Sequence, residues 1–292
     1  MPSSIMSKRF NIPALLLVIA AAPLIGLQPL PTRAQSLQTP DQHRLALIQA
    51  LRNLLPDSTP DHWRPGASGS TELVQAIALN SDNATNSADI LAIGKKLWER
   101  KFKNGKSLAS CFPNAGKRVA VTYPQFDPKS KRVVTQEMAL NRCFALHGES
   151  EIALGDAAVI GPLGAYFRSL SEGQKLNVRV GTPQAREKFD AGRALFSRRM
   201  GQQNYACASC HVLNAGRVFG QQEISPAVGQ ALSWPHLQPG GKVLALQKQF
   251  QQCMLRTGAE PFPLGSDELN NLEYYHAFIS NGLPIRILAV QR

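Results

Sequence analysis

Cys207, Cys210 and His211 form the run Cys-Ala-Ser-Cys-His, whose residue types and spacing point to one chemistry. Two thiols separated by two residues can each add to a vinyl group of a haem, and the histidine that follows then lies under the iron as its proximal ligand. The alternative is a redox-active Cys-x-x-Cys pair with an unrelated histidine. The sequence therefore predicts one haem c, attached through Cys207 and Cys210 and ligated by His211.

The haem motif belongs to the second copy of an internal repeat. One copy begins with Gly94-Lys-Lys-Leu-Trp and ends with Leu108-Ala-Ser-Cys-Phe112, and the other begins with Gly192-Arg-Ala-Leu-Phe and ends with the haem motif. Each copy reads as a helix that contains a glycine, followed by a loop and a five-residue signature. The first copy lacks the first cysteine and has Phe112 in place of the histidine, so it can neither attach haem nor ligate iron. The alternative is a chance likeness of two helix–loop segments.

The first residues indicate export. Lys8 and Arg9 precede an apolar stretch over residues 12–27 that is short for a membrane span, and a small-residue cleavage site ends at Ala34. We therefore expect a signal peptide over residues 1–34, cleaved near Ala34, and a periplasmic mature chain. An uncleaved membrane anchor is the alternative.

Two further cysteines fall in the region of the first copy of the repeat, one within it and one after it. Cys111 is the surviving half of the lost motif, and Cys143 follows 32 residues later, where a distal ligand could once have been. In an oxidising compartment cysteines tend to pair, so we predict a Cys111–Cys143 disulfide in place of the lost haem. Two buried free thiols are the alternative. With either outcome Cys253 is the odd cysteine of the five.

The distal ligand of the iron has to come from further along the chain. Cys253, Met254, His236 and His276 are the candidates. Methionine is the usual ligand of an electron carrier and raises the potential, whereas a thiolate would stabilise the ferric state and lower it. Ligand chemistry alone does not decide between Cys253 and Met254 as the distal ligand.

The elements that must position these residues are mainly helices. Apolar residues at helical spacing predict helices over Asp41–Leu55, from Ser87 onward and from Ser266 to Ile279, with the two serines as N-caps. The stretch Pro56–Ser70 is rich in Pro, Ser and Gly and reads as a linker, and a shorter helix is expected over Thr71–Leu79.

The repeat and the helices together predict a mainly α protein with two cytochrome c-like domains in tandem. We expect a helical extension and linker after the signal peptide (35–86), a haem-less domain with the disulfide (87–178) and a haem-binding domain (179–292).

The net charge of +12 is concentrated in one part of the chain. Eleven Lys or Arg and two acidic residues lie between Lys95 and Arg132, a net charge of 11 − 2 = +9. Such a basic face could attract an acidic protein partner or small anions, and an ordinary solvated surface is the alternative. No nucleic-acid partner is expected for an exported haem protein.

Four runs in the second half of the chain are distinctive. They are Met200-Gly-Gln-Gln-Asn-Tyr-Ala-Cys-Ala-Ser-Cys-His211, Leu246-Gln-Lys-Gln-Phe-Gln-Gln-Cys253, Ala259-Glu-Pro-Phe-Pro-Leu-Gly-Ser266 and Asn281-Gly-Leu-Pro-Ile285. Together they resemble SoxA, the catalytic cytochrome subunit of periplasmic thiosulfate-oxidising systems, and the likeness extends over about residues 90–285.

The resemblance implies two cytochrome c-like domains, in a family of which some members lack the first haem. It also implies that Cys253 is the distal iron ligand and is modified to a persulfide, which decides between Cys253 and Met254. The implied activity is that of an L-cysteine S-thiosulfotransferase, which joins thiosulfate oxidatively to a cysteine of a SoxYZ-like carrier protein. A SoxX-like small cytochrome c would be its heterodimer partner, and electrons would leave through haem c to an acceptor cytochrome c.

One departure from the family concerns the substrate site. The family usually has an arginine four residues before the active cysteine, where it binds the anionic substrate, and this chain has Gln249. Lys248 and Arg256 could supply the positive charge, so we expect Lys248, Gln249 and Arg256 at the substrate site. The alternatives are an electron-transfer cytochrome without catalysis, an inactive partner-binding subunit and a thiosulfate dehydrogenase that makes tetrathionate.

Overall fold

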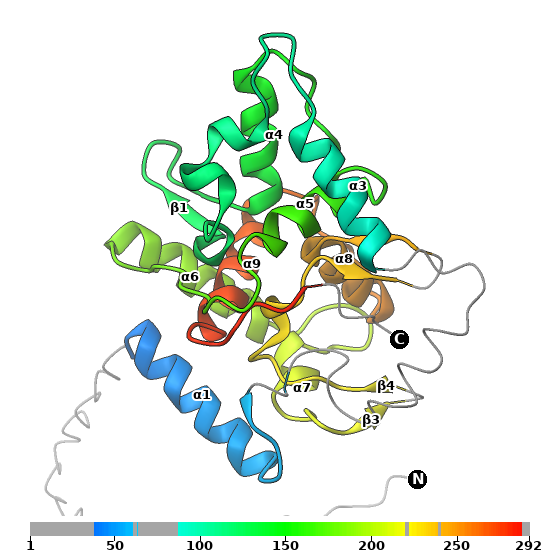
Figure 1. Ribbon diagram of the computed structural model, residues 1–292. Helices are drawn as coiled ribbons and strands as arrows, with labels where there is room; N and C mark the ends of the chain where they lie inside the picture. The colour runs from blue at the N-terminus through cyan, green and yellow to red at the C-terminus, as the bar shows by residue number, and fades with distance from the viewer. Residues whose placement is uncertain (1–37, 61–62, 64–86, 220–221, 239–240, 288–292) are drawn as a thin grey trace, which may run out of the picture. The chain divides into compact units, whose positions relative to one another are not determined.

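The computed structural model describes residues 38–60, 63, 87–219, 222–238 and 241–287 (Figure 1). The expected signal peptide, the helix expected over Thr71–Leu79 and most of the expected linker lie outside these residues. The described helices are α1 (Pro40–Leu54), α3 (Ser87–Glu99), α4 (Gln136–Leu146), α5 (Ile160–Ser169), α6 (Pro183–Ser197), α7 (Cys207–His211), α8 (Leu246–Arg256) and α9 (Asp267–Ile279).

The remaining described elements are short. The 3-10 helices are η2 (Leu108–Cys111), η3 (Pro113–Gly116), η4 (Ala120–Thr122) and η5 (Gln230–Leu232). Strands pair as antiparallel hairpins, β1 (Gln125–Asp127) with β2 (Arg132–Val134), β3 (Val218–Phe219) with β4 (Gln222–Glu223), and β5 (His236–Leu237) with β6 (Val243–Leu244). The mainly α prediction is confirmed. Within the described ranges, no helix has the length and apolar character needed to span a bilayer.

The helix ends follow their sequence signals. Helix α9 begins after Ser266, whose hydroxyl oxygen accepts a hydrogen bond from the Leu269 backbone N–H at 3.3 Å, as the predicted N-cap requires. Helix α1 begins one residue earlier than predicted, because Thr39 and Gln42 form a capping box before it.

A glycine lets two helices cross at close range in each copy of the repeat. A Cβ atom on Gly94 of α3 would lie 2.2 Å from the Pro162 carbonyl oxygen of α5, and one on Gly192 of α6 would lie 2.0 Å from the Asn271 carbonyl oxygen of α9. These are distances that only glycine allows. Figure 1 shows the second pair, α6 beside α9. The repeat is therefore structural: each copy builds the same glycine-centred helix crossing.

The aromatic residues around the two crossings also correspond. In the first copy the Trp98 ring stacks on Phe167 at a centroid distance of 5.4 Å. In the second, Phe196 meets His276 edge-on at 5.1 Å. Trp98 and Phe196 each stand four residues after the glycine of their helix, and Phe167 and His276 are both fully buried on the partner helix. His276 thus takes the place that a phenylalanine has in the first copy.

The second domain has the larger core, and the N-terminal extension is part of it. Leu47 and Leu51 of α1, together with Trp63, are buried in the same cluster as residues of α6 and α9. The His43 imidazole Nε2 lies 3.0 Å from the Tyr275 hydroxyl group, which adds a polar contact. Leu176, just before the boundary expected at residue 179, is also in this cluster.

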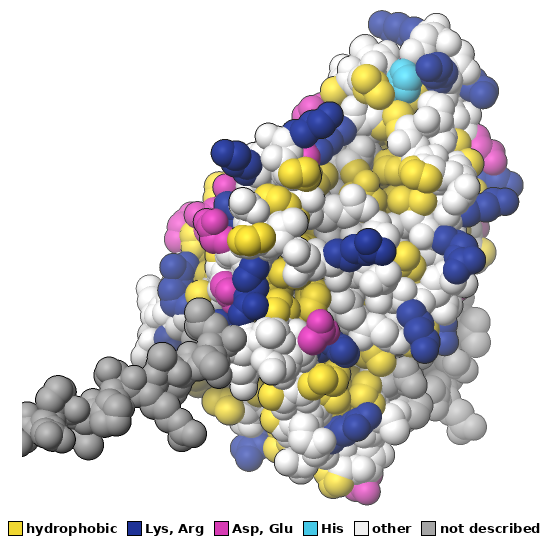
Figure 2. Space-filling view, turned by 90° about the vertical axis from the view of Figure 1, so that its left-hand side faces the viewer, with side chains coloured by type: hydrophobic (Ala, Val, Ile, Leu, Met, Phe, Trp, Pro, Cys, Tyr) yellow, Lys and Arg dark blue, Asp and Glu magenta, His cyan; other side chains and the backbone are white. Residues whose placement is uncertain are grey.

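Positive charge is spread over the face of the molecule that Figure 2 shows. Lys and Arg side chains stand across the face shown in Figure 2, with uncharged and hydrophobic side chains between them. Within the basic stretch, Lys95 pairs with Glu99 at 3.9 Å and Arg100 with Glu149 at 3.5 Å. Local acids therefore neutralise part of the stretch, and such exposed pairs add little stability.

Candidate functional site

Helix α7 presents the two cysteines and the histidine of the haem motif. Before its first turn the Ala206 backbone N–H donates to the Ser209 hydroxyl oxygen at 3.1 Å. After it, the Asn214 side-chain amide donates to the Ser209 carbonyl oxygen at 2.7 Å. These contacts are local, so the turn is set by its own sequence. Both of its thiols, Cys207 and Cys210, are free.

The imidazole of His211 is oriented by the loop that follows. Its Nδ1 atom lies 2.7 Å from the Ser225 carbonyl oxygen, which can only accept, so Nδ1 carries the proton. Nε2 then keeps the lone pair that a metal ligand needs. Burial lowers the pKa of His211, which favours the neutral ring. The Gln230 amide nitrogen, Nε2, also lies 2.7 Å from Nδ1; with the proton on Nδ1, this amide has to turn its oxygen toward the ring to make a hydrogen bond.

Cys253, on α8, lies close to these groups. Its half-buried thiol accepts a hydrogen bond from Gln249 Nε2 at 3.5 Å. Burial raises the pKa of Cys253, the Gln249 hydrogen bond and the charge of Arg256 oppose that shift, and Cys210 adds to it. Burial, followed by the charge of Cys253, raises the pKa of Cys207 to about 12. The three thiols of the second domain therefore interact electrostatically.

This set of donors fits a covalently attached haem. Two free thiols have the Cys-x-x-Cys spacing, a neutral imidazole has Nε2 available, and a third free thiol lies nearby. Because burial alone keeps the Cys253 thiol protonated, it needs a metal or a positive charge close to it to become a thiolate. A bound iron would meet that need.

The other candidates for the distal ligand have structural roles. His236 stacks on Trp234 at a centroid distance of 3.8 Å, and its Nε2 lies 2.6 Å from the Ser233 hydroxyl oxygen. Met254 is 4% exposed and belongs to the hydrophobic core. His276 is buried, and this burial, followed by the charge of His211, lowers its pKa to about 3. These contacts favour the remaining candidate, Cys253, whose sulfur is outside the core cluster.

The three residues expected at the substrate site differ in what they reach. Gln249 contacts the Cys253 thiol, and the charge of Arg256 acts on it. The Lys248 ammonium group instead donates to Gln251 Oε1 at 3.1 Å, along the same helix. The structure thus brings two of the three to Cys253, while the Lys248 contact that it describes is with Gln251.

Ser225 and Gln230 contribute to the site without having been predicted. They lie 14 and 19 residues after His211, in a segment without helical or strand periodicity. One of the contacts is made by a backbone carbonyl group, which any residue type can supply. No residue pattern could have revealed it, because the path of the loop decides which carbonyl group faces the ring.

The first domain has a disulfide at the place of the haem motif. The Sγ atoms of Cys111 and Cys143 are 2.01 Å apart, which is the pairing that the sequence predicted. Cys143 is the eighth residue of α4, and Cys253 is the eighth residue of α8; each helix has 11 residues. Cys143 and Cys253 therefore have the same position in the two helices.

Two cytochrome c-like domains in tandem, the second with a complete haem-attachment motif, define a c-type cytochrome. The family model for the SoxA/TsdA cytochrome c domain matches residues 93–176 and 191–285, and the chain belongs to this family. Each of the two matched segments contains one copy of the repeat. Membership implies that haem c is bound, in agreement with the donor set described above.

Two similar proteins are named as subunits of one enzyme. L-cysteine S-thiosulfotransferase subunit SoxA of Chlorobaculum tepidum is 41% identical over 193 residues, which are 65% of this chain and 66% of that protein. The match therefore spans just under two thirds of the relative. The subunit of the same name from Allochromatium vinosum is 28% identical over 263 residues, 88% of this chain and 92% of that protein.

The solved structure of SoxXA from P. pantotrophus contains a chain with the same fold. The TM-score is 0.67 at 24% identity, and the match covers 80% of this chain and 86% of that one. The tandem-domain prediction is therefore confirmed at the level of the fold.

Proposed function

We propose that this protein is a SoxA-type L-cysteine S-thiosulfotransferase with one haem c. The observation that carries the proposal is the free, half-buried thiol of Cys253, which interacts with Cys210 of the haem motif. The family match and the names of the relatives support the same activity. One haem is proposed because the first domain uses its remaining cysteine in a disulfide.

The proposed reaction joins two sulfur atoms and releases two electrons. A carrier thiol (R–SH) and thiosulfate give R–S–S–SO₃⁻, one proton and two electrons. First, a bond forms between the Cys253 sulfur and the outer sulfur of thiosulfate as two electrons leave. The carrier thiolate then attacks that outer sulfur and displaces the Cys253 thiolate. If Cys253 carries the persulfide, its terminal sulfur takes the place of Sγ in both steps.

A haem held by Cys207, Cys210 and His211 would supply a route for the electrons, and its iron would favour the thiolate form of Cys253. The residues of this chain hold the reactants. Gln249 donates to the Cys253 sulfur, and the positive charge of Arg256 favours the anionic form of that sulfur. The same two groups, with Lys248 next to Gln249 in the sequence, would attract the dianionic substrate. An amide gives weaker charge compensation than the family arginine, so we expect a higher KM for thiosulfate than in relatives with that arginine.

The partners follow from this reaction. A SoxYZ-like carrier brings the cysteine, a SoxX-like small cytochrome c forms the heterodimer, and an acceptor cytochrome c takes up the electrons. The structural relative was solved as SoxXA, which supports the heterodimer. The signal-like residues 1–34 support an exported, periplasmic protein.

Replacement of the proposed nucleophile is the test. In Cys253→Ala, turnover with thiosulfate and the carrier should fall by roughly a thousandfold or more, as when a covalent nucleophile is removed. Haem should remain attached, because Cys207, Cys210 and His211 are unchanged. The matched control is Met254→Leu on the next residue of α8, which should keep turnover. Turnover retained without Cys253 would contradict the proposed nucleophile, and a wild-type protein without thiosulfate-dependent turnover would be an electron carrier only.

A further inference from the structure

A hydrogen-bonded cluster fixes the first turn of α8, the helix that carries Cys253. Gln247 is 6% exposed, and both ends of its side-chain amide are used. Nε2 donates to Asn270 Oδ1 at 2.8 Å, and Oε1 accepts from the Gly265 backbone N–H at 2.8 Å. Cys253 stands six residues further along the same helix, about 9 Å along its axis. A buried amide with both ends satisfied tolerates little displacement, since a shift would leave polar groups unpaired.

The loop between α8 and α9 folds back along α8 and is tied to it again. The Gln251 side-chain amide donates to the Phe262 carbonyl oxygen at 2.8 Å. The Ala259 backbone N–H donates to the Met254 carbonyl oxygen at 2.9 Å. Gln247 and Gln251 are four residues apart and thus on the same side of the helix. The loop therefore holds α8 on both sides of the turn that leads to Cys253.

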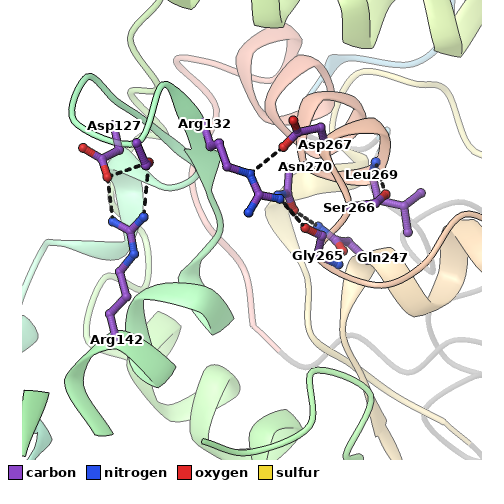
Figure 3. A network of polar contacts seen from close by, with 10 residues as sticks. Asp127, Arg132, Arg142, Gln247, Gly265, Ser266, Asp267, Leu269 and Asn270 are labelled. Carbon is purple, nitrogen blue, oxygen red and sulfur yellow. Dashed lines mark hydrogen bonds and ion pairs between the residues drawn. The ribbon is translucent and has the colours of Figure 1, made fainter. Parts of the chain in front are cut away.

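The haem-less domain closes this cluster from outside. Arg132, on β2, donates from Nη2 to the Gly265 carbonyl oxygen at 2.9 Å and from Nε to Asp267 Oδ1 at 2.6 Å (Figure 3). The Asn270 side chain donates to the same carbonyl oxygen at 3.0 Å. The Gly265 backbone is thus held at its N–H by α8, and at its C=O by α9 and by the first domain.

The hairpin that carries Arg132 is itself braced. Arg142 of α4, in the helical turn before Cys143, donates to Asp127 Oδ2 at 2.9 Å and to Ser130 Oγ at 3.4 Å (Figure 3). A chain of contacts therefore runs from the helix of the disulfide, through the hairpin and Gly265, to the helix of Cys253. The first domain has no haem motif, yet it contacts the segment that sets α8.

We propose that Gln247 is a positioning residue for Cys253, and that Arg132 of the haem-less domain supports it through Gly265. The proposal rests on the proposed role of Cys253. The only side-chain hydrogen bond of the thiol in the described structure comes from Gln249, which is on the same helix. Where the sulfur stands relative to the haem motif is therefore decided by where α8 lies, and Gln247 joins α8 to α9.

The reactivity of Cys253 measures its position directly. In the purified holoprotein Cys207 and Cys210 are attached to haem and Cys111 is paired with Cys143, so iodoacetamide can alkylate only Cys253. In Gln247→Met, which keeps the length and burial but removes the amide, we expect alkylation on the order of tenfold faster, the factor that one lost buried hydrogen bond carries. In Arg132→Ala we expect roughly threefold, since the pair is half-exposed.

Matched controls separate positioning from stability. Gln136→Met removes an equally buried glutamine at the start of α4, and Arg100→Ala removes an exposed ion pair within the first domain. Both should alkylate at the wild-type rate and leave the haem midpoint potential unchanged, whereas Gln247→Met should shift it. Should Gln247→Met fail to fold, Arg132→Ala alone decides.

Wild-type alkylation rates in Gln247→Met and Arg132→Ala would overturn the proposal. Equally fast alkylation in the two control variants would also overturn it, because it would indicate a general loss of stability and not a loss of positioning. Neither result depends on turnover, whereas the proposed function fails on the activity of Cys253→Ala.

Discussion

The two domains place a cysteine at the same position of corresponding helices and use it differently. Cys143 on α4 pairs with Cys111, whereas Cys253 on α8 stays free beside Cys210. The helix crossings behind them are alike, each with a glycine against the backbone of the partner helix. One scaffold therefore serves two purposes, and the residues of the five-residue signature decide which one.

The comparison shows how a cytochrome c fold is packed where the haem-attachment motif is missing. Phe112 fills the position of the ligating histidine, and its ring lies 4.8 Å from Phe167. In the second domain the corresponding residues are His211 and His276. The first domain has aromatic packing and a crosslink at this place, and through Arg132 it contacts Gly265 and Asp267, at the end of the loop that follows α8.

Removal of the crosslink should have the largest effect on stability. For Cys143→Ser we expect the free energy of unfolding of the first domain to fall by about 3–4 kcal/mol, the chain-entropy value for a loop of this length. Urea denaturation measures it. Wild-type protein treated with a reductant should show the same loss, and the variant should not respond to the reductant. An unchanged midpoint would mean that the disulfide does not replace the haem as a staple.

Alanine at the crossing glycines should have the next largest effect, and a similar one in both domains. Gly94→Ala and Gly192→Ala each force a Cβ atom against a carbonyl oxygen that cannot move alone, so we expect about 2–3 kcal/mol of destabilisation. Thermal unfolding checks it. Gly181→Ala is the control, since a Cβ there meets nothing within 4 Å. A neutral result at one glycine only would break the structural equivalence of the copies.

The smallest effect concerns pH. Burial holds the pKa of His276 at about 3, below the 6.5 of the unfolded chain, so the unfolded state binds more protons between these values. Stability must then fall as the pH drops below 6.5, by about 1.4 kcal/mol between pH 7.5 and 5.5. His276→Phe copies Phe167 of the first domain and should abolish this part of the pH dependence. If wild type and variant lose equal stability, His276 is not buried as a neutral ring.

Much of the fold and of the site could be predicted from local sequence signals, whereas the contacts made by the loops could not. The haem motif, the repeat, the Ser266 cap and the Cys111–Cys143 pair each depend on residues whose type and spacing are informative. Ser225 acts from an irregular loop and Gln230 from the start of the short η5, through a backbone carbonyl group and an amide that no pattern marks. Likewise, nothing in the sequence distinguishes Gln247 from the neighbouring glutamines. Its partners are Asn270 of α9 and the Gly265 backbone N–H, and the first domain braces Gly265 through Arg132.

The central claim is that, of two corresponding cysteines, Cys143 is paired in a disulfide and Cys253 stays free. Peptide mass spectrometry of the exported, non-reduced holoprotein tests it most directly. We predict one haem on the peptide with Cys207 and Cys210, a crosslink between Cys111 and Cys143, and an unpaired Cys253 with or without an added sulfur. A disulfide that includes Cys253, or a haem attached in the first domain, would contradict it.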